Sequence, residues 1–456
     1  MKRTFLSLAF SLALGCSSNA SDPPAAASGC ATATPRVTNV AFERCGVPTF
    51  GWLNDPSLGD VTAKGAVETI SSSASGVVLA VGKVKVAESH EVQMQQIAYV
   101  TQDRGTKLEA TALVGWPSDF EQRANLDVVL LLHGTAGFND SCAPSKGNDT
   151  RTLAAALASL GYVVVAPDYI GLRGMGAPTG FLHPYLVAEP TAIASLDAVR
   201  AVGKLLAKGD APVCATTRFA TLGGSQGGHA ALWVDRVAAS YAGELTHVGV
   251  VATVPPADLL GESQRALSSF VQASKNVAAL FGASSDWYGV KSKLSQVFVP
   301  PGDVEIPKAM AASCSPDLGA PKDLAAIFAA PLLEAGKSND TLRAYAPWGC
   351  ILVENGLTTT KVARPAPAYP GYGVLFVTGA SDQLVNTPIE RESFATLCKQ
   401  GMKMEYLECD GASHTQATTW SLPEITDFIR DRFAGKQPDA AKSCVVAAPS
   451  KCRGTP

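Results

Sequence analysis

Four short runs of almost continuous apolar residues constrain the fold of this chain more than any other feature of its sequence. They occupy residues 127–133, 162–166, 219–223 and 248–253. Strands buried on both faces have this composition, and parallel sheets covered by helices bury both faces. Segments with helical patterning, at 150–160 and 191–207, alternate with the runs. This alternation predicts an α/β fold with a mostly parallel, doubly wound sheet.

The sequence before these runs indicates how the sheet begins. Residues 76–81, 96–101 and 111–116 have the pattern of short strands joined by polar turns. We therefore expect an antiparallel opening to the sheet.

The alternation is interrupted once. Over residues 256–345 helices and loops replace it, so we expect an inserted helical cap, or lid. The catalytic core would then consist of residues 31–255 and 346–437, followed by a Cys-bearing tail at 438–456. Two helices after the cap have start signals. One has Thr387 as its N-cap, and the other has a capping box that starts at Ser421.

A Gly-x-Ser-x-Gly motif at 223–227 ends the third apolar run and precedes an Ala-rich segment. Such motifs also occur by chance in glycine-rich chains. In a strand–turn–helix context, however, the motif predicts a nucleophile elbow, in which the serine occupies a tight, strained turn. The helix N-terminus beside it favours negative charge. We therefore expect Ser225 to be a nucleophile.

A serine hydroxyl needs an adjacent base, and in this kind of fold the order along the chain is Ser, acid, His. Three of the six histidines follow Ser225. His229 lies on the elbow's own helix, and His247 precedes the next strand, at the wrong edge of the sheet. His414, in a loop after the strand that ends at Glu408, is therefore the predicted general base and acid.

The acid should lie on the loop after the preceding strand. Asp382 follows residues 374–377 directly and would orient His414 and stabilise its imidazolium form. Asp is also a common turn former, and Asp410 and Glu408 are the alternatives.

Two backbone N–H groups should form an oxyanion hole. One is that of Gln226, the residue after the nucleophile. For the other we expect Thr135, in the loop that begins at His133, with Gly134 or Ala136 as alternatives. His133 itself we interpret as a structural brace of this loop.

The combination of motifs resembles the secretory lipase family, of the lipase-A type, within the α/β-hydrolase superfamily. The matching residues are His133-Gly-Thr, Asp168-Tyr-Ile-Gly-Leu172, His183-Pro-Tyr-Leu186, Asp197-Ala-Val-Arg200, Gly224-Ser-Gln-Gly-Gly228, Gly379-Ala-Ser-Asp382, Cys398 with Gly401, and His414. The resemblance implies an α/β-hydrolase fold and a carboxylic ester hydrolase that needs no cofactor and no metal. It also implies a cap that contributes an acyl pocket. We interpret Asp168, His183 and Arg200 as structural, in a buried polar network near the cap.

The N-terminus indicates export. Lys2 and Arg3 precede an apolar run at 4–14 that is too short to span a bilayer. Residues 13–16 resemble a bacterial lipobox, so residues 1–16 would be a lipoprotein-type signal peptide with a lipid on Cys16. A flexible tether at 17–30 would follow. We expect a cell-envelope lipoprotein that contacts the membrane through its lipid. Cleavage by the general signal peptidase, giving a secreted protein, is the alternative.

Eleven cysteines support an exported chain. Without Cys16 ten remain, which suggests up to five disulfides. None of the ten forms a Cys-x-x-Cys pair, which argues against a zinc ribbon or a thioredoxin-like site. We expect neighbours in sequence to pair, as Cys398–Cys409 and Cys444–Cys452.

The chain has a formal net charge of −3 and no cluster of Lys and Arg, so nothing points to a nucleic-acid partner. We expect a monomer acting on a small-molecule or lipid ester. An exopeptidase or an acyltransferase could use the same three residues, and a non-catalytic binding lipoprotein could retain them. The acyl and alcohol preferences of the ester remain open.

Overall fold

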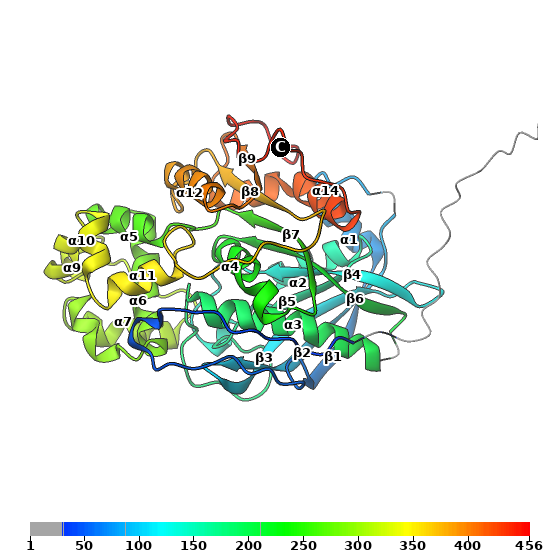
Figure 1. Ribbon diagram of the computed structural model, residues 1–456, viewed down its shortest axis with the longest axis horizontal. Helices are drawn as coiled ribbons and strands as arrows, with labels where there is room; N and C mark the ends of the chain where they lie inside the picture. Colours follow the sequence, from blue (N-terminus) through cyan, green and yellow to red (C-terminus); the bar gives the residue numbers. More distant parts are fainter. Residues whose placement is uncertain (1–29, 31, 87, 210) are drawn as a thin grey trace, which may run out of the picture.

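A computed structural model describes residues 30, 32–86, 88–209 and 211–456. The predicted signal peptide, the lipid site at Cys16 and almost all of the tether lie outside the described residues. Figure 1 shows one twisted sheet with helices on both of its faces and a group of helices at one end. No helix in the described ranges is both long and apolar enough to span a membrane.

Within the described residues the sheet has nine strands, in the order β1-β2-β3-β5-β4-β6-β7-β8-β9. From β4 and β5 onward the neighbours are parallel, and β1, β2 and β3 form the antiparallel opening. The fold is therefore the expected α/β-hydrolase fold. The strands are β1 (Val61–Ile70), β2 (Val92–Asp103), β3 (Thr106–Pro117), β4 (Ala124–Leu132), β5 (Val163–Pro167), β6 (Val213–Gly224), β7 (Thr246–Thr253), β8 (Gly373–Gly379) and β9 (Met404–Cys409).

Alternate residues of β4 point to opposite faces of the sheet and so belong to two different cores. Val128, Leu130 and Leu132 pack with the helices of one face, and Val129 and Leu131 with those of the other. One face carries α3 (Ala188–Lys208), α4 (Gln226–Tyr241) and α12 (Thr387–Lys399). The other carries α2 (Asn148–Ala158), α13 (His414–Trp420) and α14 (Leu422–Phe433).

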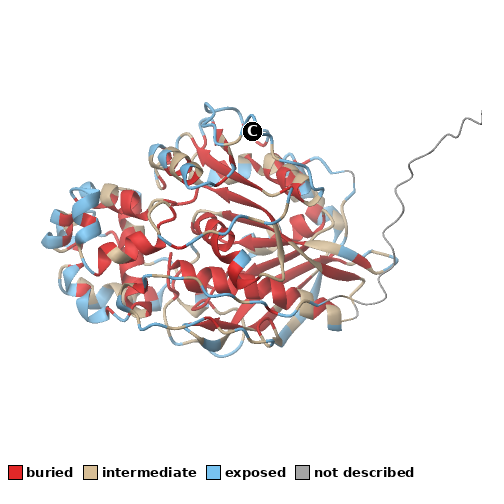
Figure 2. Cartoon of the chain, viewed as in Figure 1, coloured by how far each residue is buried: buried red, intermediate tan, exposed pale blue. Residues whose placement is uncertain are grey.

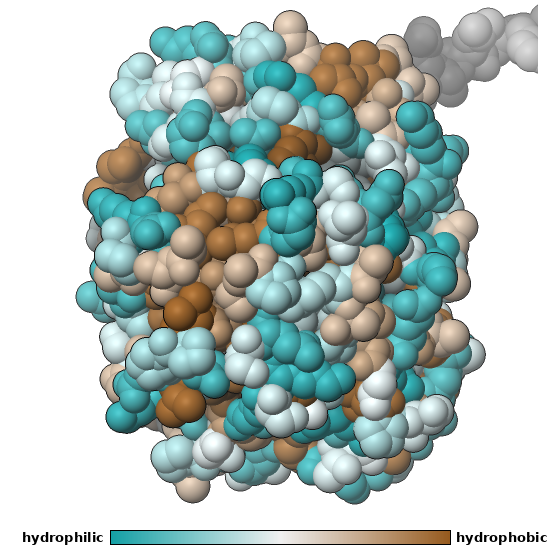
Figure 3. Space-filling view, turned by 90° about the vertical axis from the view of Figure 1, so that its left-hand side faces the viewer, coloured by the Kyte–Doolittle hydropathy of each residue, from teal (hydrophilic) through white to brown (hydrophobic). Residues whose placement is uncertain are grey.

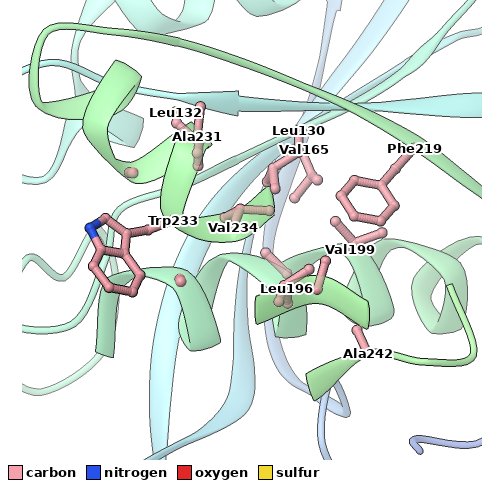
Figure 4. Close-up of a cluster of buried hydrophobic side chains, with 14 of the residues drawn as sticks. Leu130, Leu132, Val165, Leu196, Val199, Phe219, Ala231, Trp233, Val234 and Ala242 are labelled. Carbon is pink, nitrogen blue, oxygen red and sulfur yellow. The ribbon is translucent and has the colours of Figure 1, made fainter. Parts of the chain in front are cut away.

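The first of these cores is dominated by the interlocking of α3 and α4 with the sheet. In Figure 4, Leu196 and Val199 of α3 and Val234 of α4 lie opposite Leu130 and Phe219 of the strands. Figure 2 shows the same pattern for the whole molecule, with buried residues along the central strands and the helix faces that cover them. A sheet buried on both faces explains why its strands are continuous apolar runs.

The helices between β7 and β8 form the group at the left of Figure 1. They share a core of their own, which includes Phe281, Phe298, Phe328 and Trp348. We call this group the cap. It continues past residue 345, where we expected it to end, to Asn355 at the end of its last helix. Its helices are α5 (Leu259–Ser268), α6 (Gln272–Trp287), η4 (Lys291–Gln296), α7 (Gly302–Ala312), α8 (Leu324–Ile327), α9 (Ala330–Ala335), α10 (Asn339–Ala344) and α11 (Trp348–Asn355). Figure 3 views this end and shows apolar side chains gathered left of centre on a mixed surface.

One predicted strand is wrong. Residues 76–81 belong to α1 (Ser72–Val81), whose N-cap Ser71 accepts a hydrogen bond from the N–H of Ala74. A short apolar run fits either a strand or a helix segment, and here one helical turn buries Leu79 against Val84 and Ala156. Short 3₁₀ turns complete the described elements: η1 (Arg44–Gly46), η2 (Asp140–Cys142) and η3 (Pro144–Lys146).

Both predicted helix starts need a correction. The N-cap of α12 is Asn386, one residue before Thr387, and its side chain accepts from the N–H of Ile389. Ser421 does precede α14, but its hydroxyl donates to the carbonyl of Ala417 (2.7 Å) and does not cap that helix. The hydroxyl is used by the preceding helix, α13, which ends at Trp420 and has Ser421 as its C-cap.

Ten cysteines form five disulfides, as expected from their number. The bonds are Cys30–Cys214, Cys45–Cys350, Cys142–Cys314, Cys398–Cys444 and Cys409–Cys452. The predicted pairing of sequence neighbours is wrong, because the C-terminal tail runs alongside β9. A parallel bridge joins Cys409 and Ser450, and the N–H of Cys444 donates to the carbonyl of Met404. Each tail cysteine therefore meets the partner at its own end of the strand.

Candidate active site

Ser225 lies at the turn between β6 and α4, in a backbone conformation that few residues adopt. Its φ is 58° and its ψ is −121°, outside the regions that residues with a side chain favour. Its N–H donates to the carbonyl of Thr253 on the neighbouring strand β7 (2.9 Å). A strained strand-to-helix turn of this kind exposes the hydroxyl above the sheet.

Two glycines beside Ser225 allow backbone segments to approach more closely than a side chain would permit. A Cβ atom on Gly223 would contact the carbonyl oxygen of Gly227, and one on Gly227 would contact that of Leu132. The glycines of the motif therefore make the tight turn possible.

His414 and Asp382 form a hydrogen-bonded row with Ser225. The Nε2 atom of His414 lies 2.8 Å from the Oγ atom of Ser225, and its Nδ1 atom lies 2.7 Å from Oδ2 of Asp382. Ser225 follows β6, Asp382 follows β8 and His414 follows β9. The carboxyl ends of these parallel strands meet at one edge of the sheet, so the fold brings together three residues that are far apart in the sequence.

Asp382 is firmly oriented. Only 3% of its surface is exposed, and its Oδ1 atom accepts hydrogen bonds from the N–H groups of Leu384 (2.9 Å) and Val385 (3.1 Å). The alternative acids have other surroundings. Glu408 accepts from Arg391 and from the hydroxyl of Tyr406 (2.7 Å), and Asp410 is exposed.

The two other histidines that follow Ser225 in the sequence have structural contacts elsewhere. His229 Nε2 bonds the carbonyl of Asn355 (2.8 Å), and His247 Nε2 lies 2.9 Å from Thr221 Oγ1. Burial lowers the pKa of each imidazole to about 4. Both rings are therefore neutral at ordinary pH and serve as hydrogen-bonding parts of the core.

The loop after β4 passes close to Ser225. A Cβ atom on Gly134 would lie 3.8 Å from that of Ser225, and Thr135 is the next residue. His133 contacts this loop, since its Nδ1 atom lies 2.6 Å from the carbonyl oxygen of Gly134, and it stacks on Tyr169. The predicted bracing role of His133 therefore agrees with its contacts.

Gln226, the first residue of α4, is held by His183. The first N–H groups of a helix have no partner within it, so the Gln226 N–H has no intrahelical bond. The side-chain amide of Gln226 donates to His183 Nε2 (2.7 Å), and His183 Nδ1 bonds the carbonyl of Ile170 (2.9 Å). Burial lowers the pKa of His183 to about 3. The neutral ring can therefore accept at one nitrogen and donate at the other.

The expected single network of Asp168, His183 and Arg200 is wrong. The Asp168 carboxylate accepts from Ser145 and Thr111, and burial raises its pKa to about 6. Arg200 instead pairs with two other carboxylates, those of Asp197 and Glu244. The three residues are separate structural supports, and only His183 reaches the proposed oxyanion hole.

Ser225 opens into a narrow pocket of about 40 Å³ between the sheet edge and two helices of the cap. Successive turns of α5 and of α6 line it, because residues three and four apart share one helix face. The other walls come from the loops that follow β5, β7 and β8. The lining residues besides Ser225 are Tyr185, Leu186, Pro256, Leu259, Glu262, Ser263, Ala273, Asn276, Val277, Leu280, Leu384 and Val385.

A family model described as secretory lipase matches residues 145–440, well over half of the chain. The chain belongs to the secretory lipase family. As a member of this family it is a carboxylic ester hydrolase.

Two secreted triacylglycerol lipases of Malassezia globosa are similar in sequence. One is 26% identical over 349 residues, which cover 70% of this chain and 71% of the relative. The other is 27% identical over 399 residues, which cover 80% of this chain and 77% of the relative.

Solved structures show the same fold. The rice cell wall degrading esterase LipA of Xanthomonas oryzae superposes with a TM-score of 0.67 and 18% identity, covering 83% of this chain and 98% of that one. The closed state of Candida antarctica lipase A superposes with a TM-score of 0.63 and 16% identity, covering 86% of each chain. At this identity the likeness concerns the α/β-hydrolase architecture alone.

In this secretory lipase a cap helix holds the loop that carries the acid. Glu262 of α5 accepts from the N–H of Asn386 (2.5 Å), and Arg265 donates to the carbonyl of Leu384 (2.8 Å). The two side chains also pair with each other (2.7 Å). The cap therefore bonds the loop after β8 at two residues, Leu384 and Asn386, that follow Asp382 in the sequence.

Sequence reasoning missed these cap residues. Glu262 and Arg265 are three apart on one helix, a spacing typical of ordinary surface ion pairs. Nothing in the sequence marks them as neighbours of a loop more than a hundred residues later. Tyr185 belongs to the His183-Pro-Tyr-Leu186 motif, but the hydrogen bond that it accepts from Asn276 (2.9 Å) depends on how the cap folds back over the sheet.

Proposed function

We propose that this chain hydrolyses carboxylic esters through an acyl-enzyme formed on Ser225. The observation that carries the proposal is the row Ser225–His414–Asp382, with 2.8 Å and 2.7 Å between successive side chains. A hydroxyl, an imidazole and a buried carboxylate in this order are the parts of a serine hydrolase triad.

In the first half of the reaction the Ser225 oxygen attacks the acyl carbonyl carbon while His414 Nε2 takes the hydroxyl proton. The carbonyl oxygen becomes an oxyanion, which accepts hydrogen bonds from the N–H groups of Gln226 and Thr135. The C–O bond to the alcohol then breaks, and His414 returns its proton to the leaving oxygen. Asp382 holds the imidazole and stabilises its charged form.

In the second half a water molecule attacks the acyl-enzyme. His414 takes a proton from the water, and the ester bond to Ser225 breaks with return of that proton to the serine oxygen. The acid product leaves and the resting enzyme is restored.

The acyl group would occupy the apolar pocket under α5 and α6. We propose that residues 256–345, continued by α11, act as an inserted cap that supplies this pocket. Lipid esters are the substrate class that we propose, since the Malassezia globosa relatives are named triacylglycerol lipases. The proposed triad and pocket lie within one chain, so the proposed reaction needs no second copy, and we propose a monomer.

The test is Ser225→Ala with a nitrophenyl ester as substrate. Loss of the nucleophile should lower turnover by a factor on the order of 10⁴ or more. A fluorophosphonate probe should label the native enzyme and leave the variant unlabelled. The matched control is Ser269→Ala, at the end of α5 and outside the pocket, which should keep native activity. Full turnover by Ser225→Ala would refute the proposal.

We also propose that the chain is exported and carries a lipid on Cys16. The other ten cysteines are all bonded in disulfides, which form in oxidising compartments. Radioactive palmitate should be incorporated by the native chain in a bacterial host and not by Cys16→Ala. Equal labelling of the two would contradict the lipid site and leave simple secretion.

A further inference from the structure

A chain of hydrogen bonds runs from the cap to the loop beside the nucleophile. The side-chain N–H of Asn276, on α6, donates to the hydroxyl oxygen of Tyr185 (2.9 Å). That oxygen lies 3.0 Å from Oγ1 of Thr135. Tyr185 and Asn276 line the pocket that contains Ser225. These hydrogen bonds thus join three segments that are distant in sequence, at the edge of the reaction site.

The chemistry of the three side chains determines which group donates and which accepts in each of these hydrogen bonds. An amide nitrogen can only donate, so the Tyr185 oxygen is an acceptor towards Asn276. The hydrogen of Tyr185 is then available for Thr135 Oγ1. With its oxygen accepting from Tyr185, Thr135 keeps its own hydroxyl hydrogen for another acceptor. Tyr185 is buried, with 3% of its surface exposed, and burial raises its pKa, so it remains a donor.

Thr135 is well placed to use that hydrogen. It follows Gly134, whose Cβ position lies 3.8 Å from that of Ser225, and it is exposed at the surface of its loop. An acyl carbonyl attacked by Ser225 develops negative charge on its oxygen, which is the strongest acceptor that forms at this place.

We propose that the Thr135 hydroxyl donates a hydrogen bond to the substrate oxyanion, and that Tyr185 and Asn276 fix its direction. The inference rests on the proposed ester hydrolysis at Ser225 and adds a side-chain donor to the two backbone N–H groups. Thr135 is then a catalytic residue, and Tyr185 and Asn276 are positioning residues. A residue of the cap would thereby contribute to the chemical step as well as to the pocket wall.

The first experiment compares Thr135→Val with Thr135→Ser. Valine keeps the shape and the backbone N–H of threonine but has no hydroxyl, while serine keeps the hydroxyl. Loss of one oxyanion donor costs a factor on the order of 10² in kcat. We therefore expect that fall for valine, at unchanged KM, and near-native kcat for serine. A boronic acid that forms a tetrahedral adduct with Ser225 should lose affinity by a similar factor in the valine variant.

The second experiment reverses the direction of these hydrogen bonds without changing the size of the side chains. In Asn276→Asp the carboxylate can only accept, so Tyr185 would donate to it and Thr135 would donate to Tyr185. We expect kcat to fall about as far as in Tyr185→Phe, again at unchanged KM. Adding Thr135→Val to Tyr185→Phe should cause little further loss, because both remove the same contribution. Gln264→Ala, on the cap but outside the pocket, is the control and should match the native enzyme.

Each result bears on a defined part of the inference. Native kcat in Thr135→Val, while Ser225→Ala is inactive, would overturn the side-chain donor and leave ester hydrolysis intact. A fall in Thr135→Val with native kcat in both Asn276→Asp and Tyr185→Phe would overturn the positioning role. Full activity of Ser225→Ala would instead refute the proposed function itself. Fluorophosphonate labelling of every variant checks that Ser225 is folded and accessible.

Discussion

The sheet and the cap of this chain are stabilised in different ways. The sheet is buried on both faces, and its strands pack with long helices such as α3 and α4. The cap contains helices as short as four to six residues, which would be unstable in isolation. It relies on one shared apolar cluster and on two disulfides to the rest of the chain, Cys45–Cys350 and Cys142–Cys314.

This difference indicates that the sheet and the cap contribute differently to the active site. Ser225, His414 and Asp382 all follow strands of the sheet, where the backbone is most strongly held. The cap adds walls, and its Glu262 accepts a hydrogen bond from the loop after β8, which carries Asp382. Its Asn276 donates to Tyr185, whose hydroxyl in turn contacts Thr135. We therefore expect the largest effects on chemistry from substitutions at the sheet edge, and smaller ones from the cap.

The comparison predicts that Asp382→Asn and Glu262→Gln differ by several orders of magnitude. The first removes the carboxylate that orients His414 and should lower kcat by a factor on the order of 10⁴. The second weakens the bond to the loop beyond Asp382 and should cost about tenfold, since the bonds from Leu384 and Val385 remain. Steady-state kinetics on one soluble ester measures both. Similar losses of kcat in the two variants would contradict these different contributions of the sheet and the cap.

Large aromatic side chains test whether the two regions unfold together. Phe376 of β8 and Phe281 of α6 are both fully buried, so replacing either with Ala should lower the free energy of unfolding by about 3–5 kcal/mol. We expect one transition in each case, because the disulfides and polar contacts bind the cap to the sheet. Denaturation followed by tryptophan fluorescence and by activity measures this. Two separate transitions in Phe281→Ala would identify the cap as an independent unit.

Disulfide removal sharpens the same comparison. Cys142–Cys314 joins the cap to a core loop across 172 residues, whereas Cys398–Cys444 lies outside the cap and spans 46. Either double Cys→Ser variant should lose about 2–5 kcal/mol of stability. The first should lose about 1 kcal/mol more, because the entropy of a closed loop grows with the logarithm of its length. Calorimetry gives the ranking, and the opposite order would contradict it.

A pH-dependent effect is expected from a single contact between the two regions. His229 of α4 bonds Asn355 of α11, and burial lowers its pKa from 6.5 to about 4. As pH falls from 6.5 towards 4 the unfolded chain takes up a proton that the folded chain does not, so stability falls by up to about 1.4 kcal/mol per pH unit. His229→Gln removes this dependence. The stability advantage of the native enzyme should shrink over that range, and a constant difference in melting temperature would count against it.

The sequence predicted the strands and the candidate site residues wherever a local residue pattern could be combined with a general rule of the fold. Apolar runs predicted β4 to β7, and the glycine motif followed by chain order pointed to Ser225, Asp382 and His414. These inferences needed no knowledge of distant contacts, because parallel strands place the loops after them at one edge.

The remaining features depend on contacts between distant segments. Residues 76–81 have a pattern that fits strand or helix, and packing on α2 decided it. The disulfides Cys398–Cys444 and Cys409–Cys452 follow from the direction of the tail along β9. Cys444, the partner of Cys398, lies beside Met404 at the start of β9. Cys409 ends the strand, roughly 17 Å away, so Cys398 and Cys409 cannot meet. The bonds of Asn276 and Glu262 required the cap to be folded over the sheet.

The tail beside β9 also has a consequence for producing the protein. β9 is the last strand of the sheet, and residues 438–456 shield its outer edge through the two disulfides and through bonds such as Ser450 N–H to the carbonyl of Glu408 (2.9 Å). An unshielded edge strand is a template for intermolecular pairing. In a reducing cytosol the tail would lose both covalent attachments, and inclusion bodies are the expected result. Soluble enzyme should come from a periplasmic or extracellular expression route.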